Sequence, residues 1–141
     1  MKYAARMLAV AVMMMPLLAT AQLQDAHKIV AQIPFEFMVG DKAMPAGQFV
    51  VQAADRVGLV LLIKNRDTET SQYSIVSSGE DQKGAAVNAL IFHKYGNQYF
   101  LSGMELADSG SISWLPRSKA ENELRAQNVP ATQKILLASG K

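Results

Sequence analysis

The feature that most constrains this chain is a pair of apolar segments that meet at Gly96-Asn97. Residues 86–106 are rich in aromatic and branched side chains on both sides of this dipeptide. A Gly-Asn pair between two such runs is typical of a two-residue β-hairpin turn of type II′, in which the glycine takes the positive φ. The sequence therefore predicts a long antiparallel hairpin.

This turn also fixes which residues of the hairpin face each other. Tyr95 faces Gln98, and regular pairing from there places Ile91 opposite Ser102. One face then carries Leu90, Phe92, Tyr99 and Leu101, and the other carries Ala89, Ile91, His93, Phe100 and Met104. Because both faces are largely apolar, we expect one to lie in the core and the other under a helix or a partner.

The rest of the chain is also patterned for strands. Residues 27–39 alternate apolar and polar side chains for a dozen positions, with Pro34 as an interruption. Residues 48–53 and 71–77 alternate in the same way, 57–65 is a continuous apolar run typical of a strand buried on both sides, and 112–115 is expected to be a last short strand. We therefore predict an all-β fold of six or seven antiparallel strands, with a β-sandwich as the first choice and a small β-barrel as the second.

One short helix is expected near the C-terminus. Ser118 and Glu121 match a capping box, in which the serine accepts a backbone hydrogen bond and the glutamate reaches back. The sequence predicts a helix over 119–127, followed by a tail over 128–141, where 135–137 is either a packing segment or part of a frayed end.

The first 21 residues have the pattern of a cleaved secretory signal. Lys2 and Arg6 precede an apolar stretch at 7–18, and Ala19-Thr20-Ala21 is a small-x-small cleavage site. We thus expect a signal peptide over 1–21, a single β domain with its helix over 22–127, and a bacterial protein exported to the periplasm or the medium. No later stretch is long and apolar enough to span a membrane.

Composition narrows the partners of the exported chain. Without residues 1–21, basic and acidic residues are equal in number, so there is no net attraction to nucleic acid. The chain has no cysteine, which excludes disulfides and thiolate chemistry.

Three motifs resemble those of a family of small exported acidobacterial-type β proteins. They are PFEFMVGDKAMPAGQFVV at 34–51, FHKYGNQYFLSGM at 92–104 and LPRSKAENEL at 115–124. The family pattern is PF-x-F-x-VG-x-K-x-LPAG-x-Y, then HRYG-x-x-YFL, then LP-x-S-x-AE, and Met44 and Phe49 replace its usual Leu and Tyr. That family is uncharacterised, so the resemblance implies an exported β domain and assigns no activity.

The residues that could carry chemistry are few. His27 and His93 have no metal-ligand spacing, and no Gly-x-Ser-x-Gly or phosphate-binding glycine motif is present. We therefore predict no enzyme, no catalytic residue, no metal site and no cofactor, with His93 as a hydrogen-bonded structural residue. His93 bonded across a cleft to both an acid and a serine would instead favour a hydrolase.

The remaining candidates for contact with a ligand or partner are Trp114, Tyr95, Tyr99 and His93, with Trp114 expected to be the most exposed. Three functions stay open. The first is a non-catalytic exported β domain that binds another envelope or extracellular component through a sheet edge or apolar patch. The alternatives are a barrel or sandwich that binds a small apolar ligand or a carbohydrate, and a hydrolase with an unrecognised site.

Overall fold

A computed structural model describes residues 28–80, 87–107 and 110–140, and within them the chain forms eleven strands and one helix. The predicted signal peptide, 1–21, lies outside the described residues. In chain order the elements are β1 (Lys28–Ile33), β2 (Phe37–Val39), β3 (Lys42–Met44), β4 (Gly47–Ala53), β5 (Val60–Asn65), β6 (Ser71–Ile75), β7 (Ser77–Glu80), β8 (Asn88–Tyr95), β9 (Gln98–Glu105), β10 (Ser111–Trp114), α1 (Lys119–Ala126) and β11 (Ala131–Gly140).

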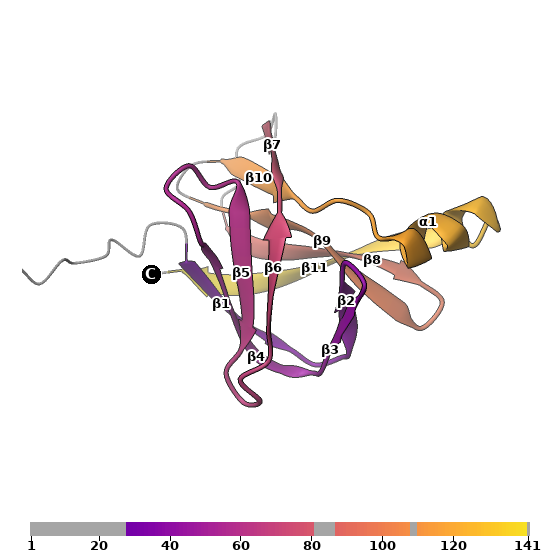
Figure 1. Cartoon of the computed structure of the whole chain (residues 1–141), viewed down its shortest axis with the longest axis horizontal. Helices are drawn as coiled ribbons and strands as arrows, with labels where there is room; N and C mark the ends of the chain where they lie inside the picture. The colour runs from indigo at the N-terminus through magenta and orange to yellow at the C-terminus, as the bar shows by residue number, and fades with distance from the viewer. Residues whose placement is uncertain (1–27, 81–86, 108–109, 141) are drawn as a thin grey trace, which may run out of the picture.

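The strands form one sheet that is nearly closed into a barrel (Figure 1). The hydrogen-bonded order is β3-β2-β9-β8-β11-β1-β4-β5-β6, and β10 pairs with both β9 and β7. Because only Val76 separates β6 from β7, the chain links the far end of this path back to β9 through β10. The predicted all-β fold with a short C-terminal helix is confirmed, and of the two expected architectures the barrel describes the sheet.

Among the described residues, strand pairing is antiparallel except for one parallel bridge, between Met38 and Phe100. The strand number exceeds the predicted six or seven because β2, β3 and β7 are only three or four residues long and because β11 lies in the predicted tail. Strands this short cannot display a clear alternating pattern.

Alternate residues of the long strands fill the inside of the barrel. Ile29, Ala31 and Ile33 of β1 are buried, whereas Lys28, Val30 and Gln32 point to the outer side. Aromatic rings occupy the centre, where the Phe37 ring lies 4.9 Å from that of Phe49 and 5.4 Å from that of Phe92. Burial of these side chains supplies the main stabilisation of a chain without disulfides.

The predicted hairpin is present as β8 and β9, with its turn at Gly96-Asn97. Gly96 has φ 60°, and Tyr95 pairs with Gln98. The predicted pairing of Ile91 with Ser102 is wrong, because a β-bulge shifts the register and places Ile91 opposite Gly103. One extra residue on a strand turns the side chains beyond it to the other face, so Met104 joins the core instead of the outer side.

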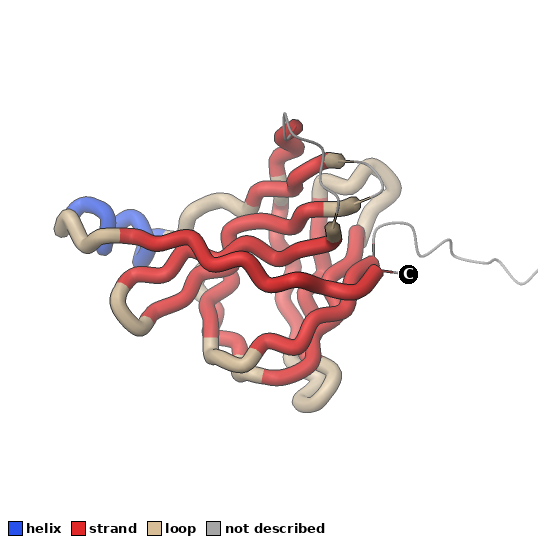
Figure 2. The backbone as a smooth tube through the Cα atoms, turned by 180° about the vertical axis from the view of Figure 1, so that it is seen from behind, coloured by secondary structure: helices blue, strands red, loops and turns tan. Residues whose placement is uncertain are grey.

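The prediction of a tail over 128–141 is wrong. Residues 131–140 form β11, which pairs with β8 over eight residues and with β1 at its end. Figure 2 shows this strand running from the helix to the C-terminal end of the described chain. Leu136 and Ala138 pack on the core, and the strand fills the gap between two others whose backbone groups need partners.

Candidate functional site

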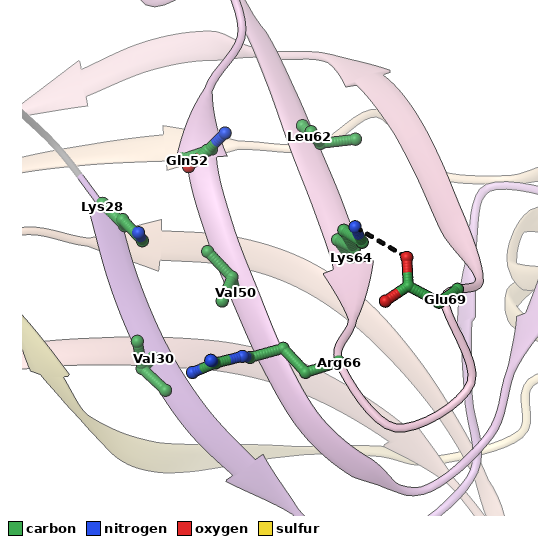
Figure 3. Close-up of a pocket in the computed structure, with 8 residues that line it drawn as sticks. All are labelled: Lys28, Val30, Val50, Gln52, Leu62, Lys64, Arg66 and Glu69. Carbon is green, nitrogen blue, oxygen red and sulfur yellow. Dashed lines mark ion pairs between the residues drawn. The ribbon is translucent and has the colours of Figure 1, made fainter. Parts of the chain in front are cut away.

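The outer wall of the barrel carries a half-open concavity of about 560 Å³ over β1, β4 and β5 (Figure 3). This volume is within the range of small-molecule sites in proteins. Its lining consists of Lys28, Val30, Val50, Gln52, Leu62, Lys64, Arg66 and Glu69.

The floor of the concavity is aliphatic. Val30, Val50 and Leu62 alternate with core residues along their strands, so the barrel geometry turns them outward. Val30 pairs directly with Val50, and Leu62 pairs with Gln52 in the next row. The three side chains are half-buried on a surface that faces solvent, with Val30 beside Val50 and Leu62 diagonal to Val50 in the next row.

Three cationic side chains surround this floor, and one carboxylate accompanies them. Lys64 Nζ lies 2.9 Å from Glu69 Oε2, and both side chains reach solvent. Lys28 and Arg66 form no ion pair with any residue that the structure describes. Arg66 extends across β4 toward Val30 (Figure 3). The concavity is therefore positively charged around an apolar centre.

The loop that carries Arg66 and Glu69 is held by Asn65. This buried side chain accepts hydrogen bonds from the backbone N–H groups of Asp67, at 2.8 Å, and Thr68, at 3.1 Å. Arg66 N–H donates to the Gln48 carbonyl at 2.8 Å. The backbone of Arg66 is thus fixed, and its long side chain stays free to change conformation.

Apolar surface continues beyond the concavity on the same outer face. Tyr73 and Ile75 of β6 are 61% and 72% exposed. Tyr73 pairs with Leu62, and Ile75 pairs with Val60. An apolar path therefore runs from the floor to the β6 side of the wall.

His93 and Tyr95 lie elsewhere, under helix α1. His93 Nδ1 is 2.8 Å from Glu121 Oε1, and the Tyr95 hydroxyl donates to the same oxygen at 2.9 Å. The Ser118 side chain caps α1 by accepting from Glu121 N–H at 3.1 Å, as predicted, but the Glu121 carboxylate bonds to the hairpin. Burial raises the pKa of Tyr95, and the hydrogen bond and charge of Glu121 raise it further. This cluster fastens the helix to the barrel.

Ser102 completes a serine, histidine and acid series with this cluster. Its Oγ is 3.3 Å from His93 Nε2, opposite the nitrogen that contacts Glu121. Ser102 is only 7% exposed and the Glu121 side chain 4% exposed. The acid and the serine expected of a hydrolase are both present at His93, but the hydroxyl that would attack a substrate is covered.

The other two predicted residues pack against the protein. The Tyr99 ring stacks on Phe35 at 3.8 Å, with Lys134 Nζ 5.6 Å from the Tyr99 ring centre. Trp114 is half-buried instead of the most exposed aromatic residue, because its ring lies over Gly103, where an added Cβ would come within 3.0 Å of it. The structure thus brings His93 and Tyr95 together and leaves Tyr99 and Trp114 apart from them.

Sequence reasoning missed the residues of the outer-wall concavity. The available signal was at Val30, Val50 and Leu62, where outward positions of strands hold aliphatic instead of polar side chains. Only the strand register shows that these three positions are neighbours. In the part of the chain that the structure describes, no group of three metal-binding side chains gathers.

Comparison with known proteins found no match to a family model, to a curated protein or to a solved structure. Among the described residues no helix is long and apolar enough to cross a membrane.

Proposed function

We propose that this chain is an exported, non-catalytic β domain that binds another envelope or extracellular component through the apolar patch of its outer wall. Support for export comes from residues 1–21, which have the composition of a signal peptide. The observation that carries the binding role is the aliphatic floor of Val30, Val50 and Leu62 within a ring of cations. The side chains of this outer surface do not fill the core, and they combine apolar and polar groups as ligand sites typically do.

An apolar patch agrees better with the sheet than a binding edge does. The β1, β4 and β5 strands each have a hydrogen-bonded neighbour on both sides. The two ends of the strand path are β3, which has only three residues, and β6, which has five. A partner strand needs a longer row of unpaired backbone groups, so side chains of the outer wall are the more suitable contact.

The test is an NMR titration of the ¹⁵N-labelled chain, residues 22–141, with a concentrated envelope extract of the source organism. Amide shifts are expected in β1, β4 and β5 around the concavity. Val50→Trp fills the floor and should abolish these shifts, whereas Ile135→Trp, on the outer side of β11, should preserve them. Shifts that are absent, or that persist unchanged in Val50→Trp, would contradict the proposed site.

The second candidate function is a hydrolase, favoured by the contacts of His93 with Ser102 and Glu121. In such an enzyme the serine attacks, the histidine accepts its proton and the acid orients the ring. The test is hydrolysis of p-nitrophenyl esters by the parent chain and by Ser102→Ala. Turnover that the substitution abolishes, with an unchanged urea melt, would replace the binding role by this activity.

A further inference from the structure

We propose that the outer-wall concavity binds a single-chain anionic amphiphile, with its acidic head at Arg66, Lys28 and Lys64 and its alkyl chain along Val50, Leu62 and the exposed side of β6. This inference rests on the proposed function and names the ligand class of the same site.

The charges of the concavity select an acidic head group. Arg66 and Lys28 form no ion pair with described residues, and Glu69 neutralises only Lys64. Arginine has a planar set of donors that binds carboxylate or phosphate oxygens in pairs. The exposed bond between Lys64 and Glu69 contributes little stability, so Lys64 can turn to a ligand at small cost.

The apolar path selects an alkyl chain. It starts at the floor beside Arg66 and continues over Leu62 to Tyr73 and Ile75, which are largely exposed. From Lys64 to Val60 the strand advances four residues, or about 13 Å at the usual rise of a β-strand. A chain of medium length would cover this path and remove its side chains from water.

The shape of the site favours one bound molecule over a bilayer or an acidic peptide. A bilayer contacts apolar side chains that protrude, but Val30 and Val50 lie half-buried at the bottom of a concavity. An extended peptide gains affinity by adding to a sheet edge, and β1, β4 and β5, which carry the concavity, are paired on both sides, whereas the end of the strand path lies at β6, beyond the concavity.

The experiment is isothermal titration of the chain, residues 22–141, with defined amphiphiles below their micelle concentrations. Sodium dodecanoate and dodecyl phosphate test the acidic head, dodecyl maltoside replaces it by a neutral one, and sodium butyrate removes the chain. We expect at least one of the two acidic dodecyl compounds to bind about tenfold or more tightly than both controls, and binding should weaken as salt is raised. The acidic compound that binds more tightly identifies the head group as carboxylate or phosphate.

Two variants, each with a control, test where the head group and the alkyl chain of the ligand bind. Arg66→Gln should weaken binding about tenfold through loss of a charged paired contact, whereas Arg56→Gln, which removes the same charge outside the concavity, should leave it unchanged. Val50→Thr keeps the shape of the floor and should weaken dodecyl binding severalfold, with Val57→Thr as its exposed control.

Several results would overturn the inference. They are equal affinity for the maltoside and the acidic compounds, no effect of Arg66→Gln, and binding to anionic phosphatidylglycerol vesicles without binding of the free amphiphiles. If the extract shifts the concavity amides while neither acidic dodecyl compound binds, the proposed function stands and this inference fails. If neither the extract nor the amphiphiles affect these amides, both fail.

Discussion

Replacement of His93 by Gln tests whether the cluster under α1 is structural. The ring uses both nitrogens, at 2.8 Å from Glu121 and at 3.3 Å from Ser102. A hydrogen bond to a charged group contributes about 1.5–3 kcal/mol, and a bond between neutral groups about 1 kcal/mol. Glutamine can restore one of the two contacts, and the 22% exposure of the His93 side chain admits water to the other. We therefore expect a loss of about 1–2 kcal/mol.

Urea melts of the parent chain and His93→Gln measure this loss. With a slope of about 1.5 kcal/mol/M, the midpoint should fall by about 1 M. A double-mutant cycle with Glu121→Gln should give a coupling energy of about 1 kcal/mol, because the two side chains contact each other directly. Tyr95→Phe removes a hydroxyl bonded to Glu121 and serves as a second probe, with Tyr99→Phe as its control outside the cluster.

Elemental analysis of the same samples completes the test. A structural histidine predicts a lower midpoint with no change in metal content. An unchanged midpoint, together with stoichiometric zinc or copper that disappears in His93→Gln, would refute the structural role and identify a metal ligand.

Four further outcomes follow from the sequence and the structure. Gly96→Val should cost about 1–3 kcal/mol in a urea melt, because a β-branched residue is strained at φ 60° although nothing crowds the site, and an unchanged midpoint would exclude this. Deletion of 131–141 should abolish the cooperative melt, since it removes a strand between two others; a folded product would contradict the topology. The pKa of Asp55 should lie below 3.8 by NMR, because its carboxylate accepts hydrogen bonds from the backbone N–H groups of Val60 and its neighbour Leu59. The resulting stabilisation of the folded chain is present above the pKa that Asp55 has in the unfolded chain, and it is lost as the pH falls through the lower pKa of the folded chain. Mass spectrometry of exported protein should find an N-terminus near Gln22, and retention of 1–21 would refute the signal peptide.

The parts of the fold that local chemistry determines could be predicted from the sequence. The turn at Gly96-Asn97 depends on a positive φ that glycine adopts at low cost, so the hairpin and its first pairs were correct. Ser118 could be identified as a helix cap because this interaction is also local: its hydroxyl bonds to a backbone group three residues away.

The parts that depend on distant contacts could not be predicted. β11 has four polar side chains among its ten residues, and its position follows from the open edges of β8 and β1, which are far away in sequence. The bulge at Ser102 could not be predicted either, because the buried residues of β9 are consecutive and show no alternation that an extra residue would interrupt. Both features arise because backbone groups seek partners across the whole barrel.

The candidate site depends on the same long-range register. Val30, Val50 and Leu62 come from three strands, and only the pairing of β4 with both β1 and β5 makes them neighbours. The sequence alone led us to the aromatic residues and His93, whose side chains are occupied by contacts within the protein. Long-range pairing therefore decided both which predicted residues make contacts within the protein and which unpredicted ones lie together on the outer wall.

The residues of the outer wall can be compared with those that folding alone requires. Inward residues of β1, β4 and β5 must be apolar because they fill the barrel, but the outward positions need only suit a strand. Threonine would serve that purpose at Val30 and Val50 and would expose less apolar surface to water. Their aliphatic side chains lie next to Arg66 and Lys28, which form no ion pair within the described chain. A ligand that covers the floor and pairs with the cations would bury this apolar surface and neutralise this charge together, and for this reason we propose a binding role for the wall.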